Sequence, residues 1–147
     1  MGSNYAVMIS QGKVPSMSLV AVTRIRAEKY AQIKDVLPQD LKIYDSAEAL
    51  FLAFDKGELK IDGVMIVTPN YSHEEIACQA FKRGLSVLCD KPSGVYSRQA
   101  RQMLNSYEEA KALFPDLQFG MIFQQRTNPV YKKMKEIADS KKYGKIK

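Results

Sequence analysis

The feature that most constrains the fold of this chain is the alternation of short apolar runs with helix-compatible segments. The expected strands are residues 19–22, 41–44, 63–67, 85–89 and 118–123. No tight hairpin turn joins one run to the next, so consecutive strands must be connected by crossovers, which gives a parallel sheet. We therefore predict an α/β fold: a doubly wound parallel sheet with helices on both faces.

The helices between these strands are predicted from helical spacing, caps and breakers. Their expected ranges are 3–10, 27–36, 45–57, 72–84, 97–114 and 129–138. Asp45 with Glu48, and Ser72 with Glu75, have the spacing of capping boxes, and Ser97 is the expected cap of the longest helix. The run at 63–67 is the most apolar, so we expect it to be a central strand.

Composition excludes several classes of protein. The chain is 46% hydrophobic, but its longest apolar runs are far shorter than the roughly 20 residues of a membrane helix. Its start resembles no secretory signal, so we expect a cytoplasmic protein that binds no membrane. Its two cysteines, Cys78 and Cys89, and its single histidine, His73, do not fit a disulfide scaffold, a zinc site or a multi-histidine metal centre.

The net charge of +6 is concentrated at the C-terminal end. Seven lysines lie between residues 132 and 147, where Glu136 and Asp139 are the acidic residues. This tail has a single aromatic residue, Tyr143, rather than an interleaved series, and it has no nucleic-acid-binding motif. We interpret it as solvated surface, and we expect no nucleic-acid partner.

Polar residues follow three of the expected strands. They form the segments 23–26 (Thr-Arg-Ile-Arg), 68–73 (Thr-Pro-Asn-Tyr-Ser-His) and 90–92 (Asp-Lys-Pro). Ligands of open parallel sheets bind beyond the carboxyl ends of the strands. We therefore expect these segments to face one crevice.

Two residues in these segments can be interpreted either as functional residues or as ordinary structural residues. Lys91 follows a strand and is held by Pro92, so a neighbouring ligand could desolvate it for proton transfer; alternatively, it is a solvated lysine in an ordinary turn. His73, in the first turn of a helix, either touches a ligand over the helix N-terminus or is a packing or capping residue. The segments taken singly do not decide between these interpretations.

Taken in order, the motifs T-P-N-x-x-H, D-K-P and F-Q-Q-R-T-N-P resemble the glucose-fructose oxidoreductase, inositol dehydrogenase and MocA family. The resemblance covers essentially the whole chain. It implies a Rossmann-like fold and an NAD(P)-dependent oxidoreductase. Such an enzyme transfers a hydride between nicotinamide and a hydroxyl-bearing carbon of a sugar or cyclitol, and a homo-oligomer is expected. The alternative is a non-catalytic nucleotide-binding or regulatory module with the same fold.

The resemblance also implies roles for individual residues. Lys91 is the expected catalytic residue, which would hydrogen-bond or protonate the reacting oxygen. Asp90 stands where the family has glutamate, and the Lys91–Pro92 peptide bond is expected to be cis. The remaining residues expected to line the cofactor are Thr68, Pro69, Asn70, His73, Asp90, Pro92 and Gln124, with Gln124 near the nicotinamide.

Arg24 carries the prediction of cofactor preference. NAD-specific dinucleotide domains usually have an acid after the second strand, where this chain has Arg24. A guanidinium pairs well with a 2′-phosphate, and Thr23 adds a hydroxyl. We therefore expect NADP, with NAD possible; a plain exposed arginine is the alternative.

Compared with the family, the chain begins late. Gly2 corresponds to the final glycine of the glycine-rich turn, so the first strand and most of that turn are expected to be absent, and Gly2 would hold an anion at a helix start. We expect residues 1–140 to be a truncated dinucleotide-binding domain and residues 141–147 to begin a connection to a substrate domain. Without a first strand, either the second and fourth family strands pair directly or a second copy covers an edge.

Overall fold

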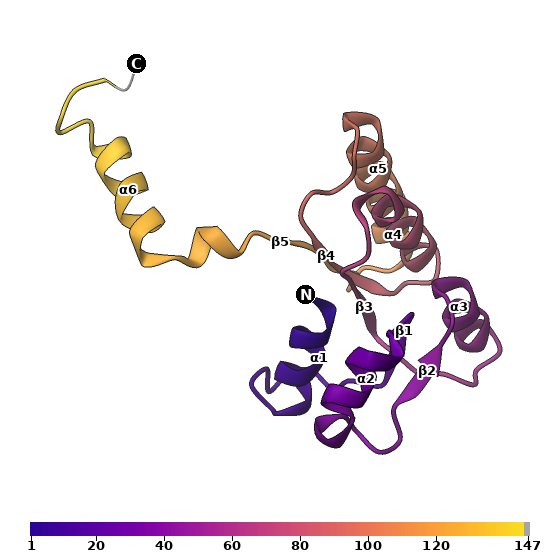
Figure 1. Ribbon diagram of the computed structural model, residues 1–147. Coiled ribbons are helices and arrows are strands. Elements are labelled where there is room, and N and C mark those ends of the chain that lie inside the picture. Colours follow the sequence, from indigo (N-terminus) through magenta and orange to yellow (C-terminus); the bar gives the residue numbers. More distant parts are fainter. Residues whose placement is uncertain (146–147) are drawn as a thin grey trace.

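The computed structural model describes residues 1–145, in which helices and short strands alternate (Figure 1). The strands are β1 (Ala21–Thr23), β2 (Lys42–Tyr44), β3 (Gly63–Ile66), β4 (Ser86–Asp90) and β5 (Phe119–Ile122). The α-helices are α1 (Gly2–Ser10), α2 (Ala27–Ile33), α3 (Ala47–Asp55), α4 (His73–Phe81), α5 (Ser97–Leu113) and α6 (Pro129–Ser140). Short 3₁₀ turns are η1 (Lys34–Val36), η2 (Asn70–Ser72) and η3 (Gln124–Thr127).

The strands form two parallel sheets rather than one. β1 pairs with β2, and a second sheet has the order β3-β4-β5; every pair is parallel. The predicted parallel α/β architecture with helices on both sides is confirmed. The expectation of a central β3 is wrong, because β3 lies at the edge of its sheet. Of the two alternatives for the absent first strand, direct pairing of β1 with β3 does not occur, and the covering of an edge by a second copy stays a prediction. Among residues 1–145, β1 and β3 each pair with one strand, and neither has a strand on its other edge.

The core lies where α4 and α5 pack on the three-stranded sheet. α4 contacts β3, β4 and α5. The ring of Phe81 lies 5.6 Å from the ring of Tyr107 and 5.2 Å from the ring of Phe119, centroid to centroid. Phe81, on α4, is fully buried. These aromatic contacts tie two helices to β5 and fix the sheet beneath them.

The observed helix caps differ from the expected capping boxes. The cap of α3 is Ser46, whose Oγ accepts a hydrogen bond from the Ala49 amide, so the Asp45 prediction is wrong by one residue. Ser72 makes no cap hydrogen bond to α4. α5 begins after Tyr96, whose amide donates to Oε1 of Gln99, rather than after Ser97. At Ser72 the hydroxyl bonds to Thr68 and Pro69 instead, so local turn bonds compete with the helix cap.

α6 stands away from the rest of the chain and is connected through η3 (Figure 1). Exposed apolar side chains lie along it, at Val130, Tyr131, Met134 and Ile137. Residues 1–145 include no helix that is long and apolar enough to cross a membrane. The connection expected at residues 141–147 lies partly outside the described residues.

Candidate functional site at the carboxyl ends of the strands

His73 joins the segments that follow β3 and β4. Its Nδ1 lies 2.7 Å from the carbonyl oxygen of Pro92, and its Nε2 lies 2.8 Å from the carbonyl oxygen of Thr68. The side chain is 1% exposed. A neutral imidazole has one N–H and donates to one of these carbonyls, whereas an imidazolium donates to both. Because both ring nitrogens face backbone carbonyls, His73 holds the two segments together.

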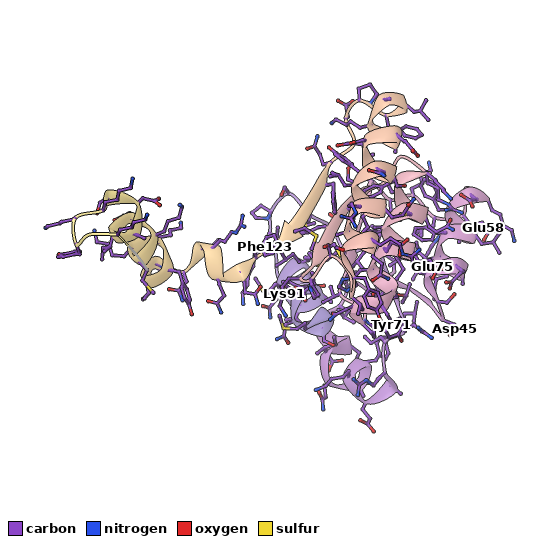
Figure 2. The ribbon with its side chains drawn as sticks, turned by 90° about the horizontal axis from the view of Figure 1, so that it is seen from above. Asp45, Glu58, Tyr71, Glu75, Lys91 and Phe123 are labelled. Carbon is purple, nitrogen blue, oxygen red and sulfur yellow. The ribbon has the colours of Figure 1, made fainter. Side chains whose placement is uncertain are left out.

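The Asp90–Pro92 turn presents Lys91 to solvent. Asp90 is buried, and its Oδ1 accepts a hydrogen bond of 2.8 Å from the Lys91 amide. The Lys91–Pro92 peptide bond is cis, as expected. The β4–β5 register pairs Asp90 with Ile122, which places Lys91 level with Phe123 where both strands end (Figure 2). The backbone of the lysine is therefore fixed while its ammonium group remains exposed.

The segment after β3 folds back on itself. The Oγ of Ser72 lies 2.8 Å from Oγ1 of Thr68 and 2.8 Å from the carbonyl oxygen of Pro69. The Ser72 hydroxyl can donate to that carbonyl while it accepts from the Thr68 hydroxyl. These bonds explain why Ser72 does not cap α4. They leave Pro69 and Asn70 exposed at the turn.

Arg24 follows β1 in a left-handed backbone conformation, with φ of 51°. Its amide donates to the carbonyl oxygen of Tyr44, so the turn is attached to β2, while the residue itself is exposed. The Ser46 hydroxyl, a backbone amide and the Arg24 charge together lower the pKa of the Glu48 carboxyl. The Arg24 side chain is therefore exposed at the surface, within electrostatic range of the Glu48 carboxylate.

A cavity of about 1050 Å³ brings some of the expected residues together. Its lining includes Gly2, Thr23, Arg24, Thr68 and Pro69. The remaining expected residues do not line it: Asn70, His73, Asp90, Lys91, Pro92 and Gln124. The expected residues thus do not share a single crevice: five line the cavity between β1 and β3, and the other six lie outside it, at the ends of β3, β4 and β5.

The ends of this site offer different chemistry. α1 begins at Gly2, and the first amides of a helix have no hydrogen-bond acceptor within the helix. A Cβ added at Gly2 would make an ordinary contact of 3.9 Å with Cβ of Val67. Gln124 begins η3 and is exposed. Residues 1–145 contain no group of three or more residues able to hold a metal ion.

The sequence motifs did not predict two hydrogen-bonding roles at this site. Ser72 closes the segment after β3, and the buried Asp90 carboxylate anchors the amide of Lys91. The sequence gives no signal for the Ser72 bonds, because its spacing from Glu75 matches a capping box equally well. The short Asp90 side chain can reach its neighbour's amide, which the D-K-P motif alone does not reveal.

Comparisons with known proteins agree with this architecture. The model of the GFO_IDH_MocA family, an oxidoreductase family with an NAD-binding Rossmann fold, matches residues 1–115. The chain therefore belongs to this family.

Its relatives include named proteins. Rhizopine catabolism protein MocA of Rhizobium meliloti is 30% identical over 119 residues, which are 81% of this chain and 34% of that protein. Inositol 2-dehydrogenase of Serratia proteamaculans is 28% identical over 126 residues, 86% of this chain and 35% of that protein. The chain thus spans about a third of the length of these relatives.

Solved structures have the same fold. An NAD-binding protein from Listeria innocua has a TM-score of 0.73 at 28% identity, over 99% of this chain and 39% of that one. Myo-inositol 2-dehydrogenase from Lactobacillus plantarum has a TM-score of 0.76 at 24% identity, over 98% of this chain and 38% of that one. Scyllo-inositol dehydrogenase from Lactobacillus casei, solved with NAD(H) and scyllo-inositol, has a TM-score of 0.73 at 21% identity, over 97% of this chain and 39% of that one.

Proposed function

We propose that the chain is the dinucleotide-binding part of an NADP-preferring oxidoreductase that acts on a cyclitol or sugar hydroxyl. Family membership supports nicotinamide chemistry. The names of the inositol dehydrogenase relatives support a polyol substrate. The observation that carries the proposal is the bridge made by His73, which ties the Lys91 turn to the segment after β3 at the ligand-binding end of the sheet.

The fit of a dinucleotide follows from the donors that this end of the sheet offers. The outward amides at Gly2 suit a phosphate group. The exposed guanidinium of Arg24 suits a 2′-phosphate, and the hydroxyl of Thr23 lies next to it in the chain. Thr68, Pro69 and Asn70 would line the middle of the nucleotide, and Asp90, Pro92 and Gln124 would surround its nicotinamide end.

His73 has a different proposed role from the rest of this set. Its ring nitrogens already face two backbone carbonyls, and its side chain is buried. We therefore assign it to positioning of the Lys91 turn rather than to direct contact with the cofactor. This assignment accounts for the T-P-N-x-x-H spacing, because the histidine reaches back to Thr68 and forward to Pro92.

Lys91 is the proposed catalytic residue. A bound nicotinamide supplies the hydride acceptor or donor. When a hydroxyl-bearing carbon is oxidised, its hydroxyl proton must leave; in the reverse direction the carbonyl oxygen must gain one. The exposed Nζ of Lys91, on a backbone held by Asp90 and His73, can exchange that proton with the reacting oxygen.

The proposal is tested by titrating the chain with NADP and with NAD, before and after Arg24→Ala. Loss of a charge-assisted phosphate contact should weaken NADP binding about 10- to 100-fold and leave NAD binding within about twofold. Arg98→Ala, an exposed arginine on α5, is the charge-matched control and should change neither affinity. Equal weakening of NADP and NAD, or no change in either, would contradict the assigned role of Arg24.

A further inference from the structure

A short link, residues 93–96, joins the turn at Lys91 and Pro92 to α5. This link belongs to no helix or strand. Packing anchors it weakly, because the side chains of Val95 and Tyr96 are 53% and 70% exposed. The position of such a segment depends on its hydrogen bonds rather than on buried apolar surface. The group that bonds to residues 93–96 therefore also helps to hold the Lys91 turn.

The side chain of Gln99, in the first turn of α5, makes these hydrogen bonds. Its Oε1 accepts from the Val95 amide at 2.7 Å and from the Tyr96 amide at 3.1 Å. Both partners are N–H donors, so the atom that faces them must be the carbonyl oxygen of the carboxamide. Val95 lies two residues before Ser97, the first residue of α5. The bond to Val95 thus reaches beyond the helix and holds the link itself.

Gly94 lies directly against the same side chain. A Cβ added at Gly94 would be 2.7 Å from Cβ of Gln99 and 3.0 Å from its Oε1. The first of these distances is too short for two carbon atoms, and the Cβ of a helical residue moves only with its helix. The absence of a side chain at position 94 therefore allows the link to run close along Gln99.

The turn that carries Lys91 is held from two directions. Before the link, the bonds made by Asp90 and His73 fix the strand side of the turn. After it, two residues separate the attachment point at Pro92 from the amides that Gln99 holds. Two extended residues span at most about 7 Å. A displacement at the helix end of so short a link must reach the lysine.

We propose that Gln99 is a positioning residue for Lys91. This inference rests on the proposed function, in which Nζ of Lys91 exchanges a proton with the reacting oxygen. In this role Gln99 touches neither substrate nor cofactor. It fixes the link that follows the lysine, so that Nζ stays where the reacting oxygen binds. Proton transfer depends steeply on geometry, so Gln99 should affect turnover more than binding.

Four variants test the role. Gln99→Leu removes the acceptor of both amides. Gln99→Glu keeps an acceptor and adds a negative charge that a helix start favours, so it is the rescue variant. Gln102→Leu, at an exposed glutamine of the same helix, is the matched control. Asp55→Asn, which loses the ion pair with Arg83 between α3 and α4, controls for lost stability.

The first measurement is amide hydrogen exchange of the chain, which needs neither cofactor nor substrate. Gln99→Leu should accelerate exchange of the Val95 and Tyr96 amides about tenfold or more, and exchange of the Lys91 amide about threefold or more. Gln99→Glu should keep all three within about twofold of the parent chain, and neither control should accelerate them selectively. Unchanged exchange of the Lys91 amide in Gln99→Leu would overturn the proposal, because the link would not transmit the change.

The second measurement is turnover, with the chain grafted in place of the matching region of Serratia inositol 2-dehydrogenase. At the plateau of each pH profile, Gln99→Leu should lower kcat about tenfold, with the KM for inositol and the cofactor Kd within about twofold of the parent values. Gln99→Glu should restore kcat, and both controls should keep it.

The outcomes separate this inference from the proposed function. Loss of kcat in Lys91→Ala but not in Gln99→Leu would overturn the positioning role alone. An equal loss in Asp55→Asn and Gln99→Leu would also overturn that role, because lost stability would then explain the effect. Unchanged kcat in Lys91→Ala would contradict the proposed function, and the positioning role would be overturned with it.

Discussion

The Nδ1 of His73 lies 2.7 Å from the carbonyl oxygen of Pro92, a residue 19 positions further along the chain. Through this contact the first turn of α4 fixes the turn that follows β4. The contact connects two motifs that are otherwise separated by a helix and a strand. It is the structural reason for treating them as one site.

The first prediction concerns this contact. His73→Ala should lower the free energy of unfolding by about 2–4 kcal/mol, because it opens a buried space and leaves the carbonyls of Thr68 and Pro92 without their partner. Hydrogen exchange of the Lys91 amide should accelerate more than exchange in the β4 interior. Glu75→Ala, at an exposed position of the same helix, is the control. Uniform acceleration throughout the chain would indicate a merely structural role.

The second prediction concerns catalysis by Lys91. Residues 1–147 are grafted into Serratia inositol 2-dehydrogenase in place of the matching region, and hydride transfer with inositol is followed by nicotinamide absorbance. Lys91→Ala should lower kcat by about 100-fold or more, with cofactor Kd within about threefold, because proton transfer is lost and nucleotide contacts remain. Lys82→Ala, an exposed lysine after α4, should leave kcat unchanged. A non-catalytic module would show no difference between the two variants.

The third prediction concerns alkaline stability. Burial, with a smaller contribution from the Asp90 charge, raises the pKa of the Cys89 thiol to about 12. The unfolded thiol ionises near pH 8.5, so the folded state is favoured below that pH and loses this advantage as pH rises toward 12. Between pH 9 and 10.5 the parent chain should lose about 1.4 kcal/mol per pH unit more than Cys89→Ala. Chemical unfolding across this range measures the difference; parallel curves would contradict it.

The fourth prediction concerns acid stability. The Arg83 guanidinium contacts both carboxylate oxygens of Asp55 at 2.8 Å and lowers the pKa of that carboxyl. The stabilisation is present above the unfolded carboxyl pKa of about 3.9 and is lost as pH falls through the lower folded value. Asp55→Asn should therefore destabilise the chain at pH 6 and make progressively less difference toward pH 2. A constant difference at all pH values would assign the effect to packing.

The order of elements and their types were predictable because they follow from local patterns. Apolar runs and breakers placed all five strands within a few residues, as in β5 at Phe119–Ile122 against the predicted 118–123. The cis Lys91–Pro92 bond followed from the family resemblance.

What could not be predicted depends on contacts between distant residues. The position of β3 at a sheet edge depends on which strands pair with it, and strand pairing joins residues that are far apart in the sequence. The Ser72 hydroxyl could bond either to the start of α4 or to Thr68. Its spacing from Glu75 predicts the bond to α4, whereas the structure has the bond to Thr68. The burial of His73 between two carbonyls likewise requires the loops to be placed in space.

The central claim is that the ends of β1, β3 and β4 serve one nucleotide. The most direct measurement is an NMR titration of the chain with NADP, following the amides of Arg24, Asn70 and Lys91. We predict that all three shift together and give a single Kd, while the amide of Val130 on α6 does not move. Shifts confined to one of the three strand ends, or separate affinities for each, would contradict the account.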